Sequence, residues 1–313
     1  MIISASRRTD IPTYYSEWFF NRIREGFVYT RNPMNIHQIS KVSLSPDVVD
    51  GIVFWTKNPI PMLSRLNEIK NYPYYFQFTL NSYGKDIESN IPNKNDSIIP
   101  AFRELSRKIE PHRVIWRYDP ILLSEKYSLS YHTQYFEEIA KRLSGFTQKC
   151  VISFVDLYRN TQNRTKDIGL LPLGEVQMIE LAKRISDIAK KYHIHIETCS
   201  EKINLEQFGI SHSHCIDCQL LEAICGYKLD LTKDKNQRLE CGCVSSIDIG
   251  AYNTCKNGCL YCYANYSEKT VQNNYLLHNP TSPLLFGEVG LEDVIKERPV
   301  KSCKQSQLNL FDT

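Results

Sequence analysis

Residues 247–263 read IDIGAYNTCKNGCLYCY, a short strand-like run followed by a loop rich in cysteine. The run Ile247–Tyr252 predicts a β-strand. The loop places Cys255, Cys259 and Cys262 in the spacing C-x3-C-x2-C. A [4Fe–4S] cluster has four irons and normally takes four thiolates. Three thiolates on one tight loop therefore leave one iron open, and an open iron can bind and activate a further ligand.

The chain before this stretch predicts repeated β–α units, because short apolar runs alternate with helical patterns up to about residue 200. The expected strands are Ile2–Ser6, Gly51–Thr56, Tyr74–Leu80, Arg113–Tyr118, Cys150–Asp156 and His193–Cys199. Together with Ile247–Tyr252 they predict an α/β fold, a parallel β/α barrel that is partly or fully closed.

Polar side chains are expected to gather at the mouth of this barrel, since chemistry in parallel β/α barrels lies at the carboxyl ends of the strands. The polar residues at or just after the carboxyl ends of the expected strands are Arg7, Arg8, Asp10, Lys57, Asn81, Arg117, Asp119, Asp156, Glu197 and Cys199. The cysteine loop follows its strand in the same sense. We therefore expect the loop and these side chains to face one site.

The loop spacing, with Tyr261 directly before Cys262, resembles the cluster loop of the radical S-adenosylmethionine enzymes. In that family the amino and carboxylate groups of S-adenosylmethionine chelate the open iron, and one electron then releases a 5′-deoxyadenosyl radical. The resemblance implies that Tyr261 meets the adenine, mainly through its backbone, and that a flavodoxin or ferredoxin supplies the electron. Our candidates for holding the cosubstrate are Tyr261, Arg7, Arg117, Asp119 and Glu197.

The resemblance also extends to a bacterial family of unknown function, over nearly the whole chain. It is carried by residues 4–12 (SASRRTDIP), 233–238 (KDKNQR), 241–243 (CGC), 248–253 (DIGAYN) and 263–265 (YAN). It implies iron–sulfur chemistry with no assigned substrate. Locally, Tyr261-Cys262-Tyr263 is similar to spore photoproduct lyase, a radical enzyme that repairs DNA.

Radical S-adenosylmethionine enzymes usually carry the cysteine loop after the first strand, whereas here it follows the last. A circular permutation accounts for this order. If Ile247–Tyr252 lies beside Ile2–Ser6, the barrel can close in the usual way, because termini that are close in space permit such rewiring.

A second group of cysteines predicts a second metal centre. Four thiolates suffice for zinc or for an auxiliary iron–sulfur cluster, and the sequence leaves this choice open. The ligands that we assign are Cys199, Cys215, Cys241 and Cys243. Cys218 is the main alternative to them, because it forms a C-x2-C pair with Cys215. Against it, Cys218 and Cys225 also fit as small buried residues on the apolar helix Gln219–Cys225.

Bulk properties place few limits on partners. The 313 residues carry a net charge of +3, with 42% hydrophobic and 23% charged residues, as is usual for a globular protein. We expect a cytoplasmic protein, since no run is long and apolar enough to cross a membrane and the start lacks the apolar region of a signal peptide. In that compartment, eleven cysteines are better explained as metal ligands than as disulfides.

The end of the chain carries another motif. Gln307–Phe311 (QLNLF) resembles the short peptide by which bacterial polymerases and repair proteins dock on the β sliding clamp. Leu310 and Phe311 are apolar anchors on a polar tail, and such anchors need a pocket. The alternative is that they pack back on the barrel. The motif favours DNA as the partner.

These observations predict four regions: a barrel core (1–200), a cysteine-rich metal-binding insertion (201–245), the last strand with the catalytic cluster loop (246–275), and a tail with the clamp-binding peptide (276–313). The predicted function is a radical S-adenosylmethionine enzyme that acts on nucleic acid, with DNA repair favoured. The alternatives are a radical enzyme that modifies RNA or a peptide, and a metal-stabilised DNA-binding module without catalytic activity.

Overall fold

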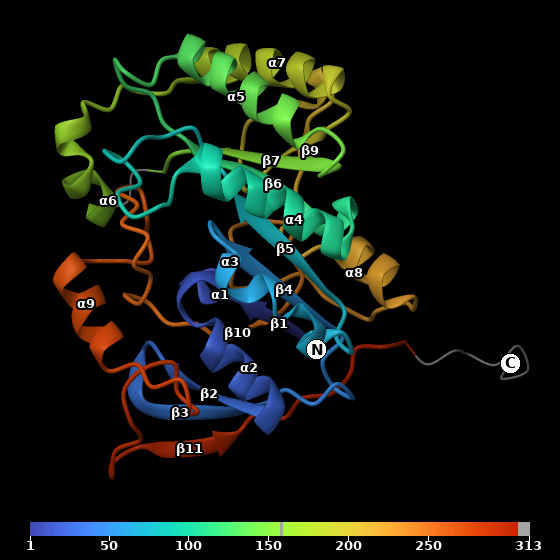
Figure 1. Ribbon diagram of the computed structural model, residues 1–313, viewed down its shortest axis with the longest axis vertical. Helices are drawn as coiled ribbons and strands as arrows, with labels where there is room; N and C mark the ends of the chain where they lie inside the picture. Colours follow the sequence, from blue (N-terminus) through green and yellow to red (C-terminus); the bar gives the residue numbers. More distant parts are fainter. Residues whose placement is uncertain (157–158, 306–313) are drawn as a thin grey trace, which may run out of the picture.

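The computed structural model describes residues 1–156 and 159–305, and its largest element is a sheet of eight strands (Figure 1). In spatial order the strands are β10 (Ile247–Asp248), β1 (Ile2–Ala5), β4 (Gly51–Thr56), β5 (Tyr74–Thr79), β6 (Val114–Ile121), β7 (Lys149–Phe154), β8 (His195–Thr198) and β9 (Ser211–His212). Each neighbouring pair is parallel. The predicted α/β class is confirmed, with a large parallel sheet.

The last strand of this sheet in the sequence lies beside the first, as a permuted order requires. Ile247 of β10 is opposite Ile3 of β1, in a parallel ladder. Among the described residues no ladder joins β9 to β10, so the strands form an open sheet and closure of the barrel is not seen. β10 is shorter than predicted because Asp248 Oδ1 accepts the backbone N–H of Gly250 at 3.0 Å, which turns the chain out of the ladder.

Helices including α4, α5 and α7 pack on one face of the sheet, whereas α6 and α9 lie at its edge (Figure 1). The bounds of the helices are α1 (Ile11–Tyr14), α2 (Ser16–Glu25), α3 (Ile60–Leu63), α4 (Ile99–Ile109), α5 (Leu129–Leu143), α6 (Arg159–Arg164), α7 (Glu175–Lys191), α8 (Cys218–Cys225) and α9 (Glu268–Leu276). Short 3-10 turns cover Leu66–Ile69, Pro111–Arg113, Lys166–Ile168 and Glu206–Phe208, and a π turn covers Lys94–Ile98. Within the described ranges, none of these helices has both the length and the apolar character that crossing a membrane requires.

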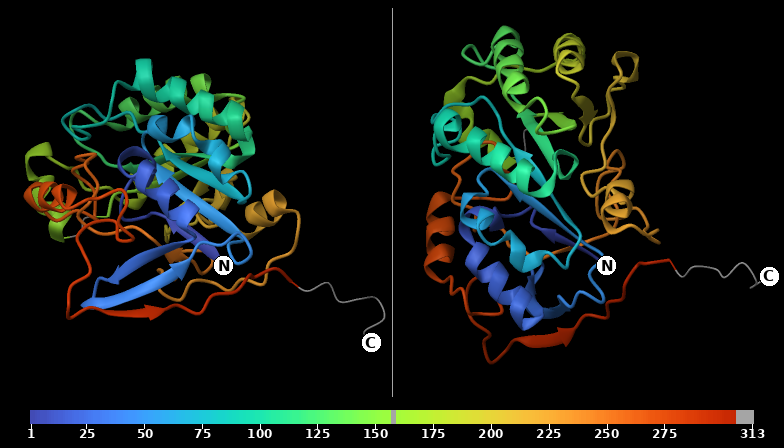
Figure 2. Two further views of the ribbon diagram at one scale, coloured as in Figure 1. Left: turned by 60° about the horizontal axis from the view of Figure 1, so that its bottom comes forward. Right: turned by 45° about the vertical axis from the view of Figure 1, so that its right-hand side comes forward.

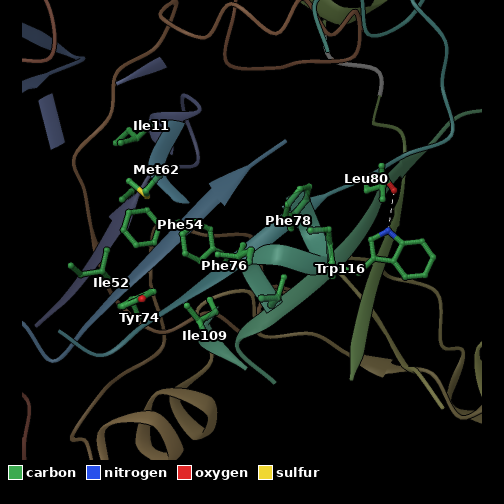
Figure 3. Close-up of a cluster of buried hydrophobic side chains, with 14 of the residues drawn as sticks. Ile11, Ile52, Phe54, Met62, Tyr74, Phe76, Phe78, Leu80, Ile109 and Trp116 are labelled. Atoms are coloured by element: carbon green, nitrogen blue, oxygen red, sulfur yellow. Dashed lines mark hydrogen bonds between the residues drawn. The ribbon is translucent and has the colours of Figure 1, made fainter. Parts of the chain in front are cut away.

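The helix-covered face of the sheet carries the main hydrophobic core (Figure 3). Side chains alternate along a strand, so every second residue points to this face. The rings of Phe54 and Phe76 stack there with their centroids 4.7 Å apart. The buried Trp116 satisfies its one polar group by donating Nε1–H to the carbonyl oxygen of Leu80 at 2.9 Å. The strands thus bury one aromatic and aliphatic layer under the helices.

The cysteine-rich segment covers the opposite face of the same sheet (Figure 2). The intervening strand residues form a second hydrophobic cluster with this segment, namely Ile2, Val53, Tyr75, Ile115 and Val151 with Cys215, Ile216, Leu221, Leu229, Cys241, Cys243 and Val244. Helix α8 begins in this segment, where the Asp217 side chain accepts the N–H groups of Gln219 and Leu220. The segment is therefore packed on the sheet, and its packing fixes where its cysteines lie.

A second, three-stranded sheet was not predicted. It contains β2 (Phe27–Asn32), β3 (Asn35–Ser43) and β11 (Val294–Glu297), with β3 in the middle. β2 and β3 are antiparallel, and β11 runs parallel to β3. Most of the expected tail (276–313) is thus packed on the molecule: Leu284 and Leu285 are buried, and the C-terminal peptide Gln307–Phe311 lies outside the described residues.

Candidate metal centres and their cavity

A cavity of about 840 Å³ lies at the carboxyl ends of the parallel strands. The seven cysteines predicted to bind metal all line it, namely Cys199, Cys215, Cys241, Cys243, Cys255, Cys259 and Cys262. Polar residues predicted for the barrel mouth line it too, namely Arg7, Arg8, Asp10, Lys57, Arg117, Asp119 and Asp156. Asn81 and Glu197, predicted for the same place, are not among its lining residues. The two groups of cysteines therefore share one space.

The loop that carries Cys255, Cys259 and Cys262, here called the triad loop, is held by the segment after β5. The N–H of Leu260 donates to the carbonyl oxygen of Ile87 at 3.0 Å. The side chain of Asn90 donates Nδ2–H to the carbonyl oxygen of Lys256 at 2.7 Å. The loop is thus anchored through its backbone, which leaves its thiols available to a ligand.

Gly258 allows the triad loop to approach that segment closely. Its φ is +68°, in the left-handed region that favours glycine. A Cβ atom built on it would lie 2.1 Å from Oγ of Ser89. The residue before Cys259 therefore needs to be glycine for both reasons.

Asp10 ties the triad loop to two strands of the sheet. Its buried carboxylate accepts four hydrogen bonds: from Thr13 N at 3.0 Å, Thr56 Oγ1 at 2.8 Å, Lys57 N at 2.8 Å and Asn257 Nδ2 at 3.0 Å. Burial nevertheless raises the pKa of Asp10 above its usual value. Since Asn257 lies between the first two cysteines of the triad, this carboxylate fixes the loop relative to the ends of β1 and β4.

A buried ionic cluster surrounds Tyr261. Glu88 accepts from Lys57 Nζ at 2.8 Å and from Lys94 Nζ at 2.5 Å, and it also accepts the hydroxyl of Tyr261. Asn81 donates to the same hydroxyl at 3.2 Å. Burial would raise the pKa of Glu88, but the two ammonium groups outweigh it and lower the pKa to about 2. The ring predicted to meet adenine is thus fixed beside the triad.

The thiols of Cys255 and Cys259 are protonated when no metal is bound. Burial raises the pKa of Cys255 well above its usual value. It raises the pKa of Cys259 to about 12, although the charge of Lys57 opposes this. Metal binding at these thiols must therefore release protons.

The second group of cysteines forms a chain of contacts. The Sγ atoms of Cys199 and Cys215 lie 3.2 Å apart, and Cys215 and Cys241 both hydrogen-bond to Cys243. Arg117 also donates Nη1–H to Sγ of Cys215 at 2.9 Å. The bonds from Cys199 and Cys243, helped by the Arg117 charge, lower the pKa of Cys215 well below its usual value. The bond from Cys243 lowers the pKa of Cys241 to about 6.

Close packing fixes this second group from both sides. The carbonyl oxygen of Cys215 accepts from Tyr75 OH at 2.6 Å and from Gln77 Nε2 at 2.8 Å. Gly242 is pressed against the ring of His214, because a Cβ atom there would lie 2.3 Å from His214 Cδ2. The cysteine-rich segment is thus bound to the strands at the point where its thiols meet.

Cys218, the alternative ligand, lies apart from the group. Its thiol is 3.9 Å from Glu222 Oε1, and it does not line the cavity. Over residues 1–156 and 159–305, no three or more histidine, cysteine, aspartate or glutamate side chains are already arranged to hold a metal ion. The thiols of the second group instead hydrogen-bond to one another, as protonated and ionised sulfur atoms do.

Most residues predicted to hold the cosubstrate lie toward the second group. Arg117 donates Nε–H to Asp119 Oδ2 at 2.8 Å as well as contacting Cys215. The positive charge of Arg7 interacts with Cys243 and Cys215. Tyr261 is the predicted residue that adjoins the triad.

Glu197, the remaining candidate, points elsewhere. Lys149 Nζ is 2.8 Å from its Oε1, and the residue does not line the cavity. The nearby Glu201 does line it, and its Oε1 accepts the N–H of Phe154 at 2.8 Å. Burial raises the pKa of Glu201 to about 7. Sequence reasoning missed Glu201, Glu88 and Lys94, because each follows a strand by several residues in a loop without a motif.

Comparison with known proteins adds a family but no activity. A family model described as "domain of unknown function (DUF1848)" matches residues 2–264. No curated protein matches significantly. Among solved structures, a protein from Bacteroides thetaiotaomicron described as a "putative alpha-L-fucosidase" is similar with 12% identity and a TM-score of 0.25, over 56% of this chain and 81% of the other.

Proposed function

The chain belongs to the DUF1848 family of unknown function, and from its own residues we propose that it is a radical S-adenosylmethionine enzyme. One observation carries this proposal: the three thiols of the triad loop face a cavity that four further thiols share. Three ligands on one loop suit a [4Fe–4S] cluster with one open iron. The four cysteines of the second group suffice for a separate metal centre, so they need not supply a fourth ligand to the triad cluster.

The donor set of the triad loop fits such a cluster. Cys255, Cys259 and Cys262 all line the cavity, and the ammonium of Lys57 lies near Cys259, so its charge offsets that of bound thiolates. S-adenosylmethionine bound there supplies the 5′-deoxyadenosyl radical when the cluster gives it one electron. Cys255, Cys259 and Cys262 would hold the iron, while the buried ion pairs of Glu88 exclude water around Tyr261.

The cavity also has a polar group that lacks a partner on the side of the triad. Oγ1 of Thr9 is buried, lines the cavity and makes no hydrogen bond among the described residues. A buried hydroxyl without a partner costs free energy unless a ligand supplies one. Thr9 therefore suits a hydrogen bond to a polar part of the cosubstrate.

For the second group we propose an auxiliary iron–sulfur cluster bound by Cys199, Cys215, Cys241 and Cys243. Cys215 and Cys241 have a lowered pKa, and the guanidinium of Arg117 lies beside Cys215. These features favour the thiolate form of cysteine, which is the form that binds metals. Zinc would use the same ligands, so the metal content decides between the two.

The proposed substrate is nucleic acid, with repair of DNA favoured. Arg7 and Arg8 supply positive charge in the cavity, and the clamp-like peptide Gln307–Phe311 would bring the enzyme to DNA. A flavodoxin or ferredoxin in the cytoplasm would supply the electron. This part of the proposal rests on the sequence resemblances and on the charge of the cavity.

The deciding experiment uses full-length protein purified and reconstituted without oxygen. With dithionite and S-adenosylmethionine added, we expect 5′-deoxyadenosine and its loss in Cys259→Ala. Iron-bound protein that releases none, with or without DNA present, would contradict the radical proposal.

The same preparation tests the second centre. Two clusters predict about eight irons per chain and no zinc. Cys215→Ser should lower the count to about four irons, whereas the matched variant Cys218→Ser should keep about eight. Four irons with one zinc would instead assign the second group a structural role.

A further inference from the structure

Beside the two metal centres, two arginines and three tyrosines form a continuous surface. We define the Arg–Tyr strip as Arg7, Arg8, Tyr252, Tyr263 and Tyr266. The guanidinium of Arg8 lies 5.0 Å from the ring centroid of Tyr252, and the rings of Tyr252 and Tyr266 stack 6.3 Å apart at 27°. The hydroxyl of Tyr263 donates to the carbonyl oxygen of Arg7 at 3.0 Å. Each member thus contacts another.

The backbone of the strip is fixed on the sheet. Asp248 Oδ2 accepts the N–H of Arg7 at 2.9 Å, and Ser6 Oγ accepts the N–H of Arg8 at 2.9 Å. Asp248 also accepts from the Ser4 and Ser6 hydroxyls at 2.7 and 2.6 Å. The two arginines therefore have a fixed backbone in the cavity wall before any ligand binds, and Tyr252 and Tyr263 line the same cavity.

Arg7 has a buried donor that nothing in the described part of the chain satisfies. Its Nη2 is buried and makes no hydrogen bond. The closest acid, Asp234, is 4.0 Å from Nη1, which is beyond hydrogen-bond distance. The guanidinium lies 5.3 Å from the ring centroid of Trp55, an arrangement that leaves its N–H edge open. A buried cationic donor in this state indicates an anionic ligand.

Other acids near the strip already have cationic or hydrogen-bonding partners. Asp119 pairs with Arg117, and Asp248 accepts the three bonds given above together with the N–H of Gly250. Arg7 interacts with Asp234, Cys215 and Cys243 through its charge, yet its Nη2 donor is unused, so a ligand can still bond to it. The guanidinium fork matches the oxygen atoms of a phosphate group.

Tyr266 extends the strip away from the arginines. It is 59% exposed, although aromatic residues are usually more buried. Cationic groups interleaved with open aromatic rings bind single-stranded nucleic acid, because phosphates meet the charges and unpaired bases stack on the rings. A base inside a duplex cannot stack in this way, nor can it reach a reacting group in a cavity.

We propose that the Arg–Tyr strip binds an unpaired strand of nucleic acid, with a phosphate on Arg7 and Arg8 and a base on Tyr266. This inference rests on the proposed function and deepens it, since it specifies that the substrate nucleotide is single-stranded or flipped out. The strand would enter the cavity beside Cys262, which directly precedes Tyr263 in the chain.

Binding to the anaerobically reconstituted full-length protein tests the strip. The probe is a fluorescein-labelled single-stranded oligodeoxynucleotide of about 12 nucleotides, compared with the same strand in a duplex. Anisotropy without S-adenosylmethionine or reductant should show clearly tighter binding of the single strand. Arg8→Gln should weaken it several-fold and reduce the slope of log K against log salt by about 0.7, and Tyr266→Ala should weaken it by about fivefold or more.

The controls are Arg184→Gln on α7 and Tyr135→Ala on α5, two exposed residues outside the strip that change charge and ring in the same way. Both should bind the strand as the parent protein does. Equal losses in the controls, or equal affinity for the duplex, would overturn the proposal.

Further measurements distinguish strand binding by the Arg–Tyr strip from cosubstrate binding and from the proposed radical chemistry. Arg8→Gln should weaken binding of the strand and leave S-adenosylmethionine binding, followed by equilibrium dialysis, unchanged. The reverse result assigns Arg8 to the carboxylate of the cosubstrate and overturns the proposal. If the protein releases 5′-deoxyadenosine but binds no single strand, the proposal for the Arg–Tyr strip is wrong and the proposed radical chemistry stands. If it binds the strand but releases no 5′-deoxyadenosine, the proposal for the strip stands and the radical chemistry is wrong.

Discussion

Asn257 Nδ2 lies 3.0 Å from Oδ2 of Asp10, two residues separated by nearly the whole length of the chain. The amide also accepts the hydroxyl of Tyr14 through Oδ1 at 2.9 Å. Asn257 is the middle residue of the C-x3-C spacer, so both bonds fix the separation of Cys255 and Cys259. The segment after β1 thus positions the triad loop, which follows β10.

Asn257→Ala should loosen the triad loop, because Asp10 then loses one of its four donors in a buried place. The free energy of unfolding should fall by about 1–3 kcal/mol, and a chelator should remove iron faster from the reconstituted protein. Urea unfolding and the rate of iron release measure the two effects. The exposed Asn67→Ala is the control and should change neither. Unchanged iron release in Asn257→Ala would show that the loop does not depend on this anchor.

Gly258→Ala should be much more harmful than a glycine substitution elsewhere with a similar backbone. Gly145 has a φ of +80° and open space around it, whereas Gly258 has a φ of +68° and Ser89 in contact. Gly145→Ala should lower the free energy of unfolding by about 1–2 kcal/mol, which is the cost of placing alanine in the left-handed region. Gly258→Ala should cost more and should lower the iron bound after reconstitution. Equal losses of stability in the two variants would mean that the crowding at Ser89 is relieved by a small movement.

The sequence identified those parts of the fold that have a local signature. Runs such as Gly51–Thr56 are buried on both faces of the sheet, so they read as continuous apolar strands. β11 has four exposed residues, Val294–Glu297, and within residues 1–156 and 159–305 its one strand partner is β3, so neither burial nor alternation marks it. Its place depends on a contact between segments far apart in the chain.

The candidate site was predictable to a similar extent. Cysteine spacing indicated the triad loop. For the second group it left only a few possible sets of four metal ligands, and some of these sets included Cys218. The hydrogen bond between Glu88 and Tyr261 joins residues 173 positions apart, and no pattern near Glu88 points to it. Arg117 shows the limit of the strand-end rule, which placed it at the cavity but did not reveal its bond to Cys215.

Glu88→Gln should strongly destabilise the protein, because it leaves the ammonium groups of Lys57 and Lys94 buried without a counter-charge. Removing one partner of a buried ion pair costs about 3–5 kcal/mol. The exposed pair of Glu137 and Lys191 provides the control, and Glu137→Gln should change the free energy of unfolding far less, because water screens the pair. Urea unfolding of the metal-free proteins measures both changes. Similar losses in the two variants would contradict the buried ionic cluster.

His132 should make the stability depend on pH below neutrality. The ring is buried, with Nδ1 at 2.8 Å from the hydroxyl of Tyr118 and Nε2 at 2.8 Å from the carbonyl oxygen of Leu122. Burial lowers the pKa of His132 to about 4, so the folded state keeps the ring neutral. The unfolded chain takes up a proton near its ordinary pKa of about 6.5, and unfolding is favoured as the pH falls below that value.

The contribution of His132 is therefore present above about pH 6.5 and is lost progressively as the pH falls toward 4. Between pH 7.5 and pH 5 the loss should be about 2 kcal/mol, from about 1.4 kcal/mol for each pH unit. Denaturant unfolding of the metal-free protein at both pH values measures it. His132→Gln should be less stable at pH 7.5, since it disturbs two buried hydrogen bonds, but it should lose about 2 kcal/mol less on acidification. An equal acid loss in the variant would show that other groups cause the dependence.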